Sequence, residues 1–418
     1  MRITIVAPGS RGDVQPYVAL GRRLVEAGYE TRLISTKNHE VLVKSNGVDF
    51  WSIEVSTEDM IRSEKMREVL ESGKLLASMT KMGNELKKNA ELVTKRTLEA
   101  CMDANLVIAG VSGLFIGHSV AEKLNIPFLQ AYNLPFTPTK AFPGVLFPNF
   151  PAIPGGNRIA HALTRQMVWQ AYRPTDKIVR KKILGLPTYP IMGPYKSAAL
   201  DKAPILYGLS PSVIPPPKDW GSNIHITGFW FLNSPADLEP SNELQRFVES
   251  GDPPIYVGFG SMSNRKPEET ANMVLLALKM TGQRAIMYSG LGSLEKSAVP
   301  SNVLMVNSAP HTWLFPRCSA VIHHGGAGTT AAGLRGGTPS IVVPFHGDQP
   351  FWGQLVTKLG VGPRPIPRNK LTADLLAQAI KDTQSSPGMR ERAARLGTLI
   401  QKEDGLTNAI QIIKNLVG

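Results

Sequence analysis

Residues 3–35 read ITIVAPGSRGDVQPYVALGRRLVEAGYETRLIS. The apolar run Ile3–Ala7 predicts a strand, and Tyr17–Ala27 carries apolar residues at helical spacing up to Gly28, where a C-terminal cap belongs. Thr31–Ser35 predicts the next strand. A strand, a helix and a second strand in this order form a βαβ unit, so the stretch predicts an α/β fold with a parallel sheet.

The same alternation returns further along the chain. We predict later strands at Leu106–Gly110 and Pro127–Gln130, with a helix between them at His118–Leu124. In the second half, strands are predicted at Pro254–Ser261, Ala285–Tyr288, Val303–Val306, Ala320–His323 and Ser340–Val343, with helices at Glu268–Thr281, Thr330–Leu334, Gln349–Leu359 and Ala373–Lys381. The proline-rich run Pro215–Trp220 indicates a boundary, so we expect two α/β domains.

The composition limits the class of partner. The chain has 418 residues, and 46 Lys and Arg against 33 Asp and Glu give a formal net charge of +13. Such an excess fits a nucleic acid, an anionic membrane surface or a phosphorylated ligand. Cys101 and Cys318 form no CxxC pair, which favours a reducing compartment. We find neither a signal peptide nor a run of the ~20 apolar residues that a membrane helix needs, so we expect a cytoplasmic protein.

The loop Gly9–Pro16 follows the first predicted strand, at the edge where open α/β sheets bind ligands. It has neither the Gly-Lys-Ser/Thr ending of a phosphate loop nor the glycine spacing of a dinucleotide fingerprint. Arg11 is suited to contact an anion, and Asp13 to accept a proton. The structural alternative is that Asp13 caps a helix that begins near Pro16 and that Arg11 is solvated.

Two further loops carry candidate ligand contacts. His323–Thr330 follows a strand and opens a helix, whose first amides and dipole favour a diphosphate; the alternative is a glycine-rich turn with a core histidine. Asp348 and Gln349 can accept and donate several hydrogen bonds to sugar hydroxyls, or Asp348 can act as an N-cap. Since the sequence has no Asp-x-Asp pair, we expect no obligate metal.

These motifs resemble the inverting glycosyltransferases of GT-B fold. Within them the chain is most similar to sterol 3β-glucosyltransferases and the related bacterial natural-product glycosyltransferases. The resemblance rests on Gly9–Pro16, Gly258–Met262, Ala309–Phe315, His323–Thr330 and Gly347–Gln349, and for the sterol branch on Tyr207–Ser212, Pro217–Trp220 and His225–Phe231. It implies two Rossmann-like domains facing across a cleft. Their expected ranges are 1–215 for the acceptor, 216–240 as linker, 241–400 for the nucleotide sugar and 401–418 as a helix crossing back to the first domain.

The resemblance also implies roles for residues. Asp13 stands where this branch has its proposed catalytic base. The expected donor contacts are Ser10, Arg11, Ser261, Ser308, His311, His324, Gly325, Gly326, Gly328, Thr329, Asp348 and Gln349. Ser308 replaces the tryptophan that stacks on uracil in the plant branch, and Ala332 replaces the glutamate that binds the ribose. Those two departures leave UDP and dTDP open as the nucleotide.

The expected function is inverting transfer of glucose from UDP-glucose to the hydroxyl of a sterol or similar hydrophobic alcohol, without a cofactor. Three alternatives remain: transfer from a UDP- or dTDP-sugar to a polyketide, peptide or glycolipid aglycone, a sugar-nucleotide epimerase of the same fold, and a non-catalytic nucleotide-binding protein. A nucleic-acid partner is disfavoured because no recognisable nucleic-acid module accompanies the basic residues.

The positive charge gathers in two segments. Arg158–Lys202 holds nine basic and two acidic residues, and Ile61–Arg96 intersperses Met and Leu with Lys. This pattern is compatible with peripheral contact to an anionic membrane, from which the enzyme would collect its acceptor. The alternative is a solvated helix face whose apolar residues belong to the core.

Overall fold

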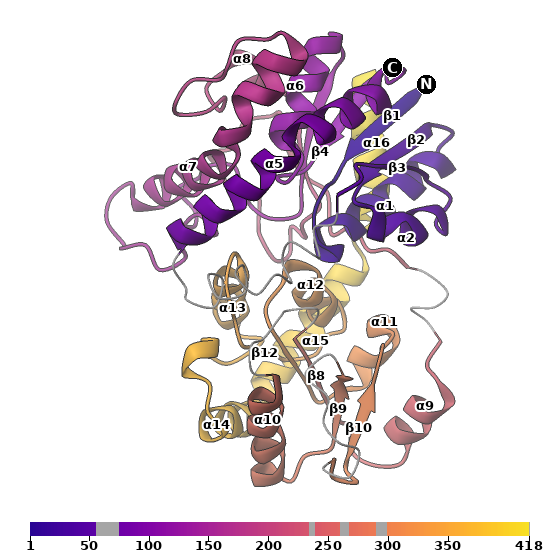
Figure 1. The fold of residues 1–418 in the computed structure, drawn as a ribbon. Coiled ribbons are helices and arrows are strands. Elements are labelled where there is room, and N and C mark those ends of the chain that lie inside the picture. Colours follow the sequence, from indigo (N-terminus) through magenta and orange to yellow (C-terminus); the bar gives the residue numbers. More distant parts are fainter. Residues whose placement is uncertain (56–74, 234–238, 260–266, 290–298, 418) are drawn as a thin grey trace. The chain divides into compact units, whose positions relative to one another are not determined.

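The structure, a computed structural model, describes residues 1–55, 75–233, 239–259, 267–289 and 299–417. The chain divides into two compact units (Figure 1). Unit 1 comprises Met1–Leu232 and Glu403–Gly418, and unit 2 comprises Asn233–Lys402. Each unit has its own sheet, with a hydrophobic core on either face.

Unit 1 contains a seven-stranded parallel sheet, in the order β3-β2-β1-β4-β5-β6-β7. The strands are β1 (Arg2–Val6), β2 (Glu30–Ser35), β3 (Asp49–Ser52), β4 (Leu106–Ala109), β5 (Phe128–Tyr132), β6 (Ile205–Tyr207) and β7 (Ile224–Ile226). The order reverses between β1 and β4, which is the topological switch point of this sheet.

Helices cover both faces of the unit 1 sheet. They are α1 (Arg11–Glu26), η1 (Lys37–His39), α2 (Glu40–Lys44), α5 (Leu75–Cys101), α6 (Leu114–Leu124), α7 (Gly156–Asp176), the π-helical η2 (Lys177–Leu184), α8 (Ala198–Lys202) and α16 (Gly405–Val417). One core joins the sheet to α1 and α16, and the other joins it to α5, α6 and η2. Helix α16 packs against α1 and buries Ala409 and Ile413 completely.

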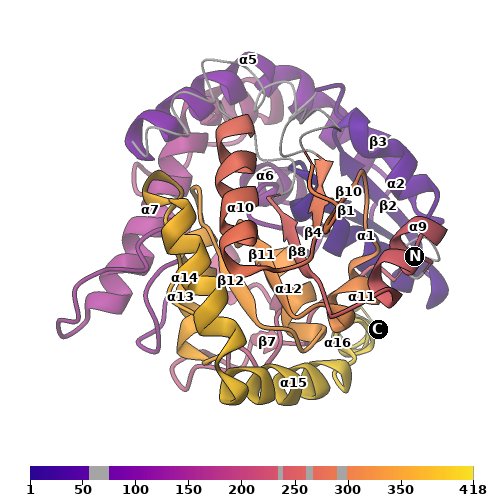
Figure 2. The same cartoon turned by 90° about the horizontal axis from the view of Figure 1, so that it is seen from below.

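Unit 2 contains a five-stranded parallel sheet, in the order β10-β9-β8-β11-β12. The strands are β8 (Ile255–Gly258), β9 (Ala285–Tyr288), β10 (Val303–Val306), β11 (Ala320–His323) and β12 (Ser340–Val342). The helices are α9 (Asn242–Glu249), α10 (Pro267–Thr281), α11 (His311–Leu314), η6 (Phe315–Arg317), α12 (Ala327–Arg335), α13 (Gln349–Lys358), η7 (Arg368–Lys370), α14 (Ala373–Gln384) and α15 (Pro387–Gln401). Helices α10 and α14 pack together over one face of this sheet (Figure 2), and α9 and α11 belong to the core on the other.

The prediction of an α/β protein with two Rossmann-like parallel sheets is confirmed. Several local expectations differ from the structure, and two of the differences have a clear physical reason. Helix α1 begins at Arg11 rather than near Tyr17, because Ser10 and Asp13 cap it before Pro16 is reached. The range 216–240, expected to be a linker, contains β7, which pairs with β6 in the unit 1 sheet.

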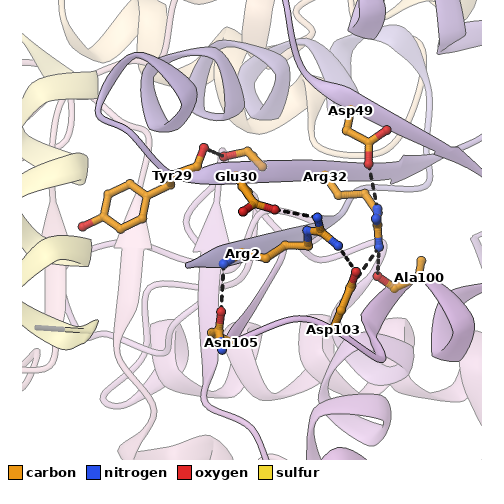
Figure 3. A network of polar contacts seen from close by, with 9 residues as sticks. Arg2, Tyr29, Glu30, Arg32, Asp49, Ala100, Asp103 and Asn105 are labelled. Atoms are coloured by element: carbon orange, nitrogen blue, oxygen red, sulfur yellow. Dashed lines mark hydrogen bonds and ion pairs between the residues drawn. The ribbon is translucent and has the colours of Figure 1, made fainter.

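A network of charges ties together the amino ends of β1 to β4 (Figure 3). Arg32, with 11% of its side chain exposed, bonds to Asp49 at 2.8 Å, Asp103 at 3.0 Å and the carbonyl of Ala100 at 2.8 Å. Arg2 pairs with Asp103 and, at 2.5 Å, with Glu30. Because the last turn of α5 supplies the Ala100 carbonyl, Arg32 also compensates the negative end of that helix dipole.

None of the helices in the described part of the chain combines the length and the apolar character that a bilayer crossing requires.

Candidate functional site

Both sheets present polar residues just beyond the strands at which the strand order reverses. In unit 1, Asp13 follows β1. In unit 2, residues 324–329, which include the first turn of α12, follow β11, which pairs with β8 at the switch point. Open α/β sheets bind ligands at these carboxyl edges, because the helices on either side leave to opposite faces. Each unit therefore has one candidate site at its switch point.

Asp13 occupies the first turn of α1 and is half-buried. Its Oδ2 accepts hydrogen bonds from the Ser10 amide at 3.0 Å and from the Ser10 hydroxyl at 2.8 Å. A side chain on Gly9 would lie 2.8 Å from the Asp13 Cβ, so glycine is needed there for close approach. The capping alternative is thus realised, and a carboxylate has further lone pairs for a ligand hydroxyl.

Two tyrosines that the sequence analysis did not single out lie within electrostatic reach of Asp13. Tyr17 donates to the carbonyl of Ala131 at 2.6 Å, and Tyr172 of α7 donates to the carbonyl of Ser112 at 2.9 Å. Burial raises the pKa of both phenols, and the charge of Asp13 raises it further. Both tyrosines are neutral at physiological pH. Helical spacing could have predicted that Tyr17 lies near Asp13, because it follows one turn later. No nearby sequence pattern predicts the same of Tyr172.

Helix α12 presents its free amides beyond β11. The first intrahelical bond runs from the Thr330 amide to the carbonyl of its N-cap, Gly326, at 2.9 Å, so the amides of 327–329 precede the hydrogen-bonded ladder. Gly328 is exposed at this end, and Thr329 is half-buried with no side-chain hydrogen bond within the described residues. This is the physical basis of an anion site: unpaired donors together with the positive end of a helix dipole.

His323, which was not predicted as a site residue, fixes this loop. It is fully buried, and its Nδ1 accepts the amide hydrogen of Gly325 at 3.0 Å. Burial lowers the pKa of His323 to about 3, so the ring is neutral and carries its proton on Nε2. That atom has no hydrogen-bond partner in the described part of the chain. The sequence pattern predicts that His323 ends strand β11, but it does not predict the bond to Gly325, which depends on the loop conformation.

His324 is a neutral hydrogen-bonding group rather than a cation. Burial lowers its pKa to about 4, and the neighbouring His346 contributes a smaller lowering. Its Nδ1 is buried, and no described residue forms a hydrogen bond with it. Close packing confines the ring, since a Cβ on Gly326 would lie 2.5 Å from the Nε2 of His324. With no anion beside it, His324 is therefore uncharged.

Asp348 and Gln349 follow β12 and open α13. Asp348 is its N-cap, and its Oδ2 accepts from the indole of the buried Trp352 at 2.8 Å. The Oε1 of Gln349 accepts from the amides of Phe345 at 2.8 Å and His346 at 3.2 Å. Both side chains therefore hold the loop in place, and Asp348 remains half-exposed.

The remaining predicted donor residues are spread more widely. Ser308 is exposed after the edge strand β10. His311 stacks on Phe315, with ring centroids 4.3 Å apart, and its Nε2 lies 3.3 Å from the hydroxyl of Tyr256 in β8. Arg11 is exposed beside Ser10 in unit 1, whereas the other predicted donor residues belong to unit 2. Ser261 lies outside the described residues.

Comparison with known proteins shows the family. A model of the glycosyltransferase family 28 N-terminal domain matches residues 3–143, and one of the erythromycin biosynthesis protein CIII-like C-terminal domain matches 289–412. Two sterol 3-beta-glucosyltransferases of Arabidopsis thaliana are 35% and 36% identical over 98% of this chain, covering 67% and 65% of their own lengths. One of Aspergillus fumigatus is 35% identical over 99% of this chain and 30% of its own length.

The chain belongs to the glycosyltransferase family that contains these sterol 3-beta-glucosyltransferases. It spans about two thirds of the length of the plant relatives and under a third of the fungal one. The resemblance seen in the motifs is thereby confirmed.

Solved structures show the same fold. A glycosyltransferase of kitacinnamycin has a TM-score of 0.71 and 18% identity, covering 100% of this chain and 99% of its own. A Streptomyces sp. SF2575 glycosyltransferase complexed with thymidine diphosphate has a TM-score of 0.62 and 19% identity, covering 99% of each chain. At these identities the likeness concerns the fold alone.

The two glycines of the α12 loop should respond differently to alanine. Gly325 has φ +87°, and a Cβ there would lie 2.6 Å from Val342, so Gly325→Ala should lower the free energy of unfolding by about 1–3 kcal/mol. Gly328 has open space around it, so Gly328→Ala should leave stability unchanged or raise it by about 0.5–1 kcal/mol. Denaturant unfolding measures both.

If Gly328→Ala also weakens binding of a nucleoside diphosphate in calorimetry, the methyl group obstructs an anion at this helix end. Unchanged affinity would contradict that role.

Acid should destabilise the fold through its buried histidines. Between pH 6.5 and 4 the unfolded chain binds a proton at His324 that the folded chain excludes, so the free energy of unfolding falls as pH falls through this window. His118 and His161, whose pKa burial also lowers to about 4, act in the same direction. His324→Asn should reduce the loss between pH 7 and pH 5 by about 1–2 kcal/mol.

Proposed function

We propose that the protein transfers glucose from UDP-glucose to the hydroxyl of a sterol or similar flat, hydrophobic alcohol, with inversion at C1. The observation that carries this proposal is the match to sterol 3-beta-glucosyltransferases at 35–36% identity along 98% of the chain. Asp13 supports it, because a half-buried carboxylate stands at the switch point of unit 1. A cytoplasmic location and the absence of a cofactor stay predictions.

Asp13 would act as general base. As the acceptor oxygen forms its bond to C1 of glucose, its hydroxyl proton would pass to the carboxylate of Asp13. The bond between C1 and the phosphate oxygen breaks on the opposite face, and UDP leaves with the bonding electrons. The Ser10 amide and hydroxyl, both bonded to Oδ2, hold the carboxylate in one orientation for this transfer.

The donor contacts would come from unit 2. The amides that open α12 and the hydroxyl of Thr329 would bind the diphosphate, with neutral His324 as a further donor. Asp348 would accept hydrogen bonds from the sugar hydroxyls while it holds Trp352. In this proposal fixed dipoles stabilise the charge of the leaving diphosphate, and no metal is required.

The second candidate function uses a dTDP-sugar and a polyketide, peptide or glycolipid aglycone. Two observations favour it: Ser308 and Ala332 stand where the plant branch has its base-stacking tryptophan and its ribose-binding glutamate. A structural neighbour was also solved with thymidine diphosphate. The two functions differ in the nucleotide and in the acceptor, so product analysis separates them.

A substrate panel tests the function directly. The purified protein should convert a sterol and UDP-glucose to the sterol β-glucoside, detected by mass and by the anomeric coupling in NMR. Activity should persist after addition of EDTA. A dTDP-sugar with macrolide or flavonoid acceptors forms the competing arm. Product in that arm alone would establish the second candidate function, and loss of all activity in EDTA would contradict the metal-free proposal.

Asp13→Asn should separate catalysis from folding. Asparagine retains an oxygen that accepts from the Ser10 amide, so the start of α1 is preserved, but it cannot accept a proton. We expect kcat to fall about 10²–10⁴-fold with little change in UDP affinity. Ser10→Ala is the control: it removes the hydroxyl bond to Oδ2, leaves the amide bond and keeps the base, so a much smaller loss is expected. Near-parental kcat for Asp13→Asn would show that Asp13 is not the base.

A further inference from the structure

An apolar patch lies exposed on unit 1, around helix α7. Five large apolar side chains form it, and we call it the α7 surface: Ile153, 53% exposed, Ile159, 45%, Leu163, 40%, Ile191, 68%, and Met192, 64%. Helix α7 runs along the periphery of unit 1 in both views (Figure 1, Figure 2). The opposite side of α7 packs on α5, where a Cβ on Gly83 would lie 2.8 Å from the carbonyl of Ala171.

These side chains share one side of the helix. Ile159 and Leu163 are one turn apart, and Gln166 and Gln170 continue the same face at spacings of three and four residues. Both glutamines hold the following loop against that face. Gln166 donates to the carbonyl of Met192 at 2.6 Å, and Gln170 donates to that of Ile191 at 3.2 Å.

The buried end of the patch is anchored from beneath. The indole of Trp169, 1% exposed, donates to the carbonyl of Ile191 at 2.8 Å. Ile153 precedes the helix, and its carbonyl accepts from the Gly156 amide at 2.9 Å. The backbone around the α7 surface is therefore fixed while its apolar side chains face solvent, an arrangement typical of interaction sites.

The basic residues of 158–202 divide into two groups. Acidic partners occupy three of them: Arg158 pairs with Asp219 at 3.1 Å, the buried Arg180 with Glu122 at 2.9 Å, and Lys182 with Glu91 at 2.6 Å. The other six have no ion pair to a described residue: Arg173, Lys177, Lys181, Lys196 and Lys202 are exposed, and Arg165 is half-buried. Lys177 and Lys181 continue from α7 into η2, and Lys196 follows four residues after Met192.

We propose that the α7 surface docks on an anionic lipid bilayer. Its apolar side chains would enter the boundary between headgroups and acyl chains, and the neighbouring ammonium groups would remain at the level of the lipid phosphates. Charge complementarity selects this partner: residues 158–202 hold nine basic residues against the two acids Asp176 and Asp201, so the lysines without an ion pair present an uncompensated positive rim. Each lysine near such a surface raises binding about fivefold.

Vesicle co-sedimentation of the full chain tests the proposal without donor or acceptor, so its outcome is independent of the proposed reaction. Vesicles of phosphatidylcholine with phosphatidylserine should bind the protein at low salt, and pure phosphatidylcholine should bind it much more weakly. The triple variant Lys177→Gln, Lys181→Gln, Lys196→Gln should weaken binding about 100-fold. The charge-matched control Lys381→Gln, Lys402→Gln, Lys414→Gln removes three exposed lysines elsewhere and should lose little.

A second test variant and its control examine the apolar side chains of the α7 surface. Ile191→Ser with Met192→Ser should weaken vesicle binding about tenfold. Leu276→Ser with Met280→Ser, which alters two exposed side chains on α10, should not weaken it. Thermal unfolding checks that all variants fold. The proposal would be overturned if the parent fails to bind vesicles, or if the control variants lose as much binding as the test variants. It would also be overturned if the triple lysine variant and the Ile191/Met192 variant bind as well as the parent, and this patch would then be left to a protein partner instead.

Discussion

The reversal of strand order within each parallel sheet is the constraint on which the candidate sites depend. On one side of the reversal in unit 1, α1 leaves β1 for one face, and on the other side α6 leaves β4 for the opposite face. The carboxyl ends of these two strands are therefore not covered by their own helices. Packing around the opening then demands residues without side chains: a Cβ on Gly113 would lie 2.3 Å from the carbonyl of Val6. The same logic places Gly325 beside Val342 in unit 2.

At these edges, the residues for which a chemical role is proposed also hold the local backbone in place. Asp13 caps α1 through Ser10, Asp348 holds Trp352 at the start of α13, and Gln349 accepts two amides of the preceding loop. Structural and functional interpretations of such residues are not exclusive, because a carboxylate accepts several hydrogen bonds at once. The bonds also restrict the rotamer, so the oxygen that would face a ligand is already oriented before binding.

The sequence predicted the two parallel sheets and the strand ends at which the candidate sites lie, because both depend on local patterns. Apolar runs followed by glycine-rich turns mark β1, β8 and β11 with no knowledge of the tertiary fold. The sequence did not predict the features that depend on contacts between residues distant along the chain. The short strand β7 resembles linker sequence and is a strand only because β6 lies beside it. Tyr172 approaches Asp13 only through the packing of α7. The low pKa of His324 follows from burial that no motif encodes.

The net charge of +13 is not concentrated at the predicted diphosphate site. His323 and His324 are neutral there, and the helix end offers dipoles rather than ammonium groups. Dipoles of fixed orientation suit an anion that must bind and leave repeatedly, since they need no counter-ion to be displaced and are little screened by salt when buried. Surface lysines such as Lys177 and Lys181 behave in the opposite way: their attraction reaches about one Debye length and weakens with ionic strength. The two kinds of positive potential in this chain thus differ in their dependence on salt, as expected if, as proposed, the first binds a small ligand and the second an extended surface.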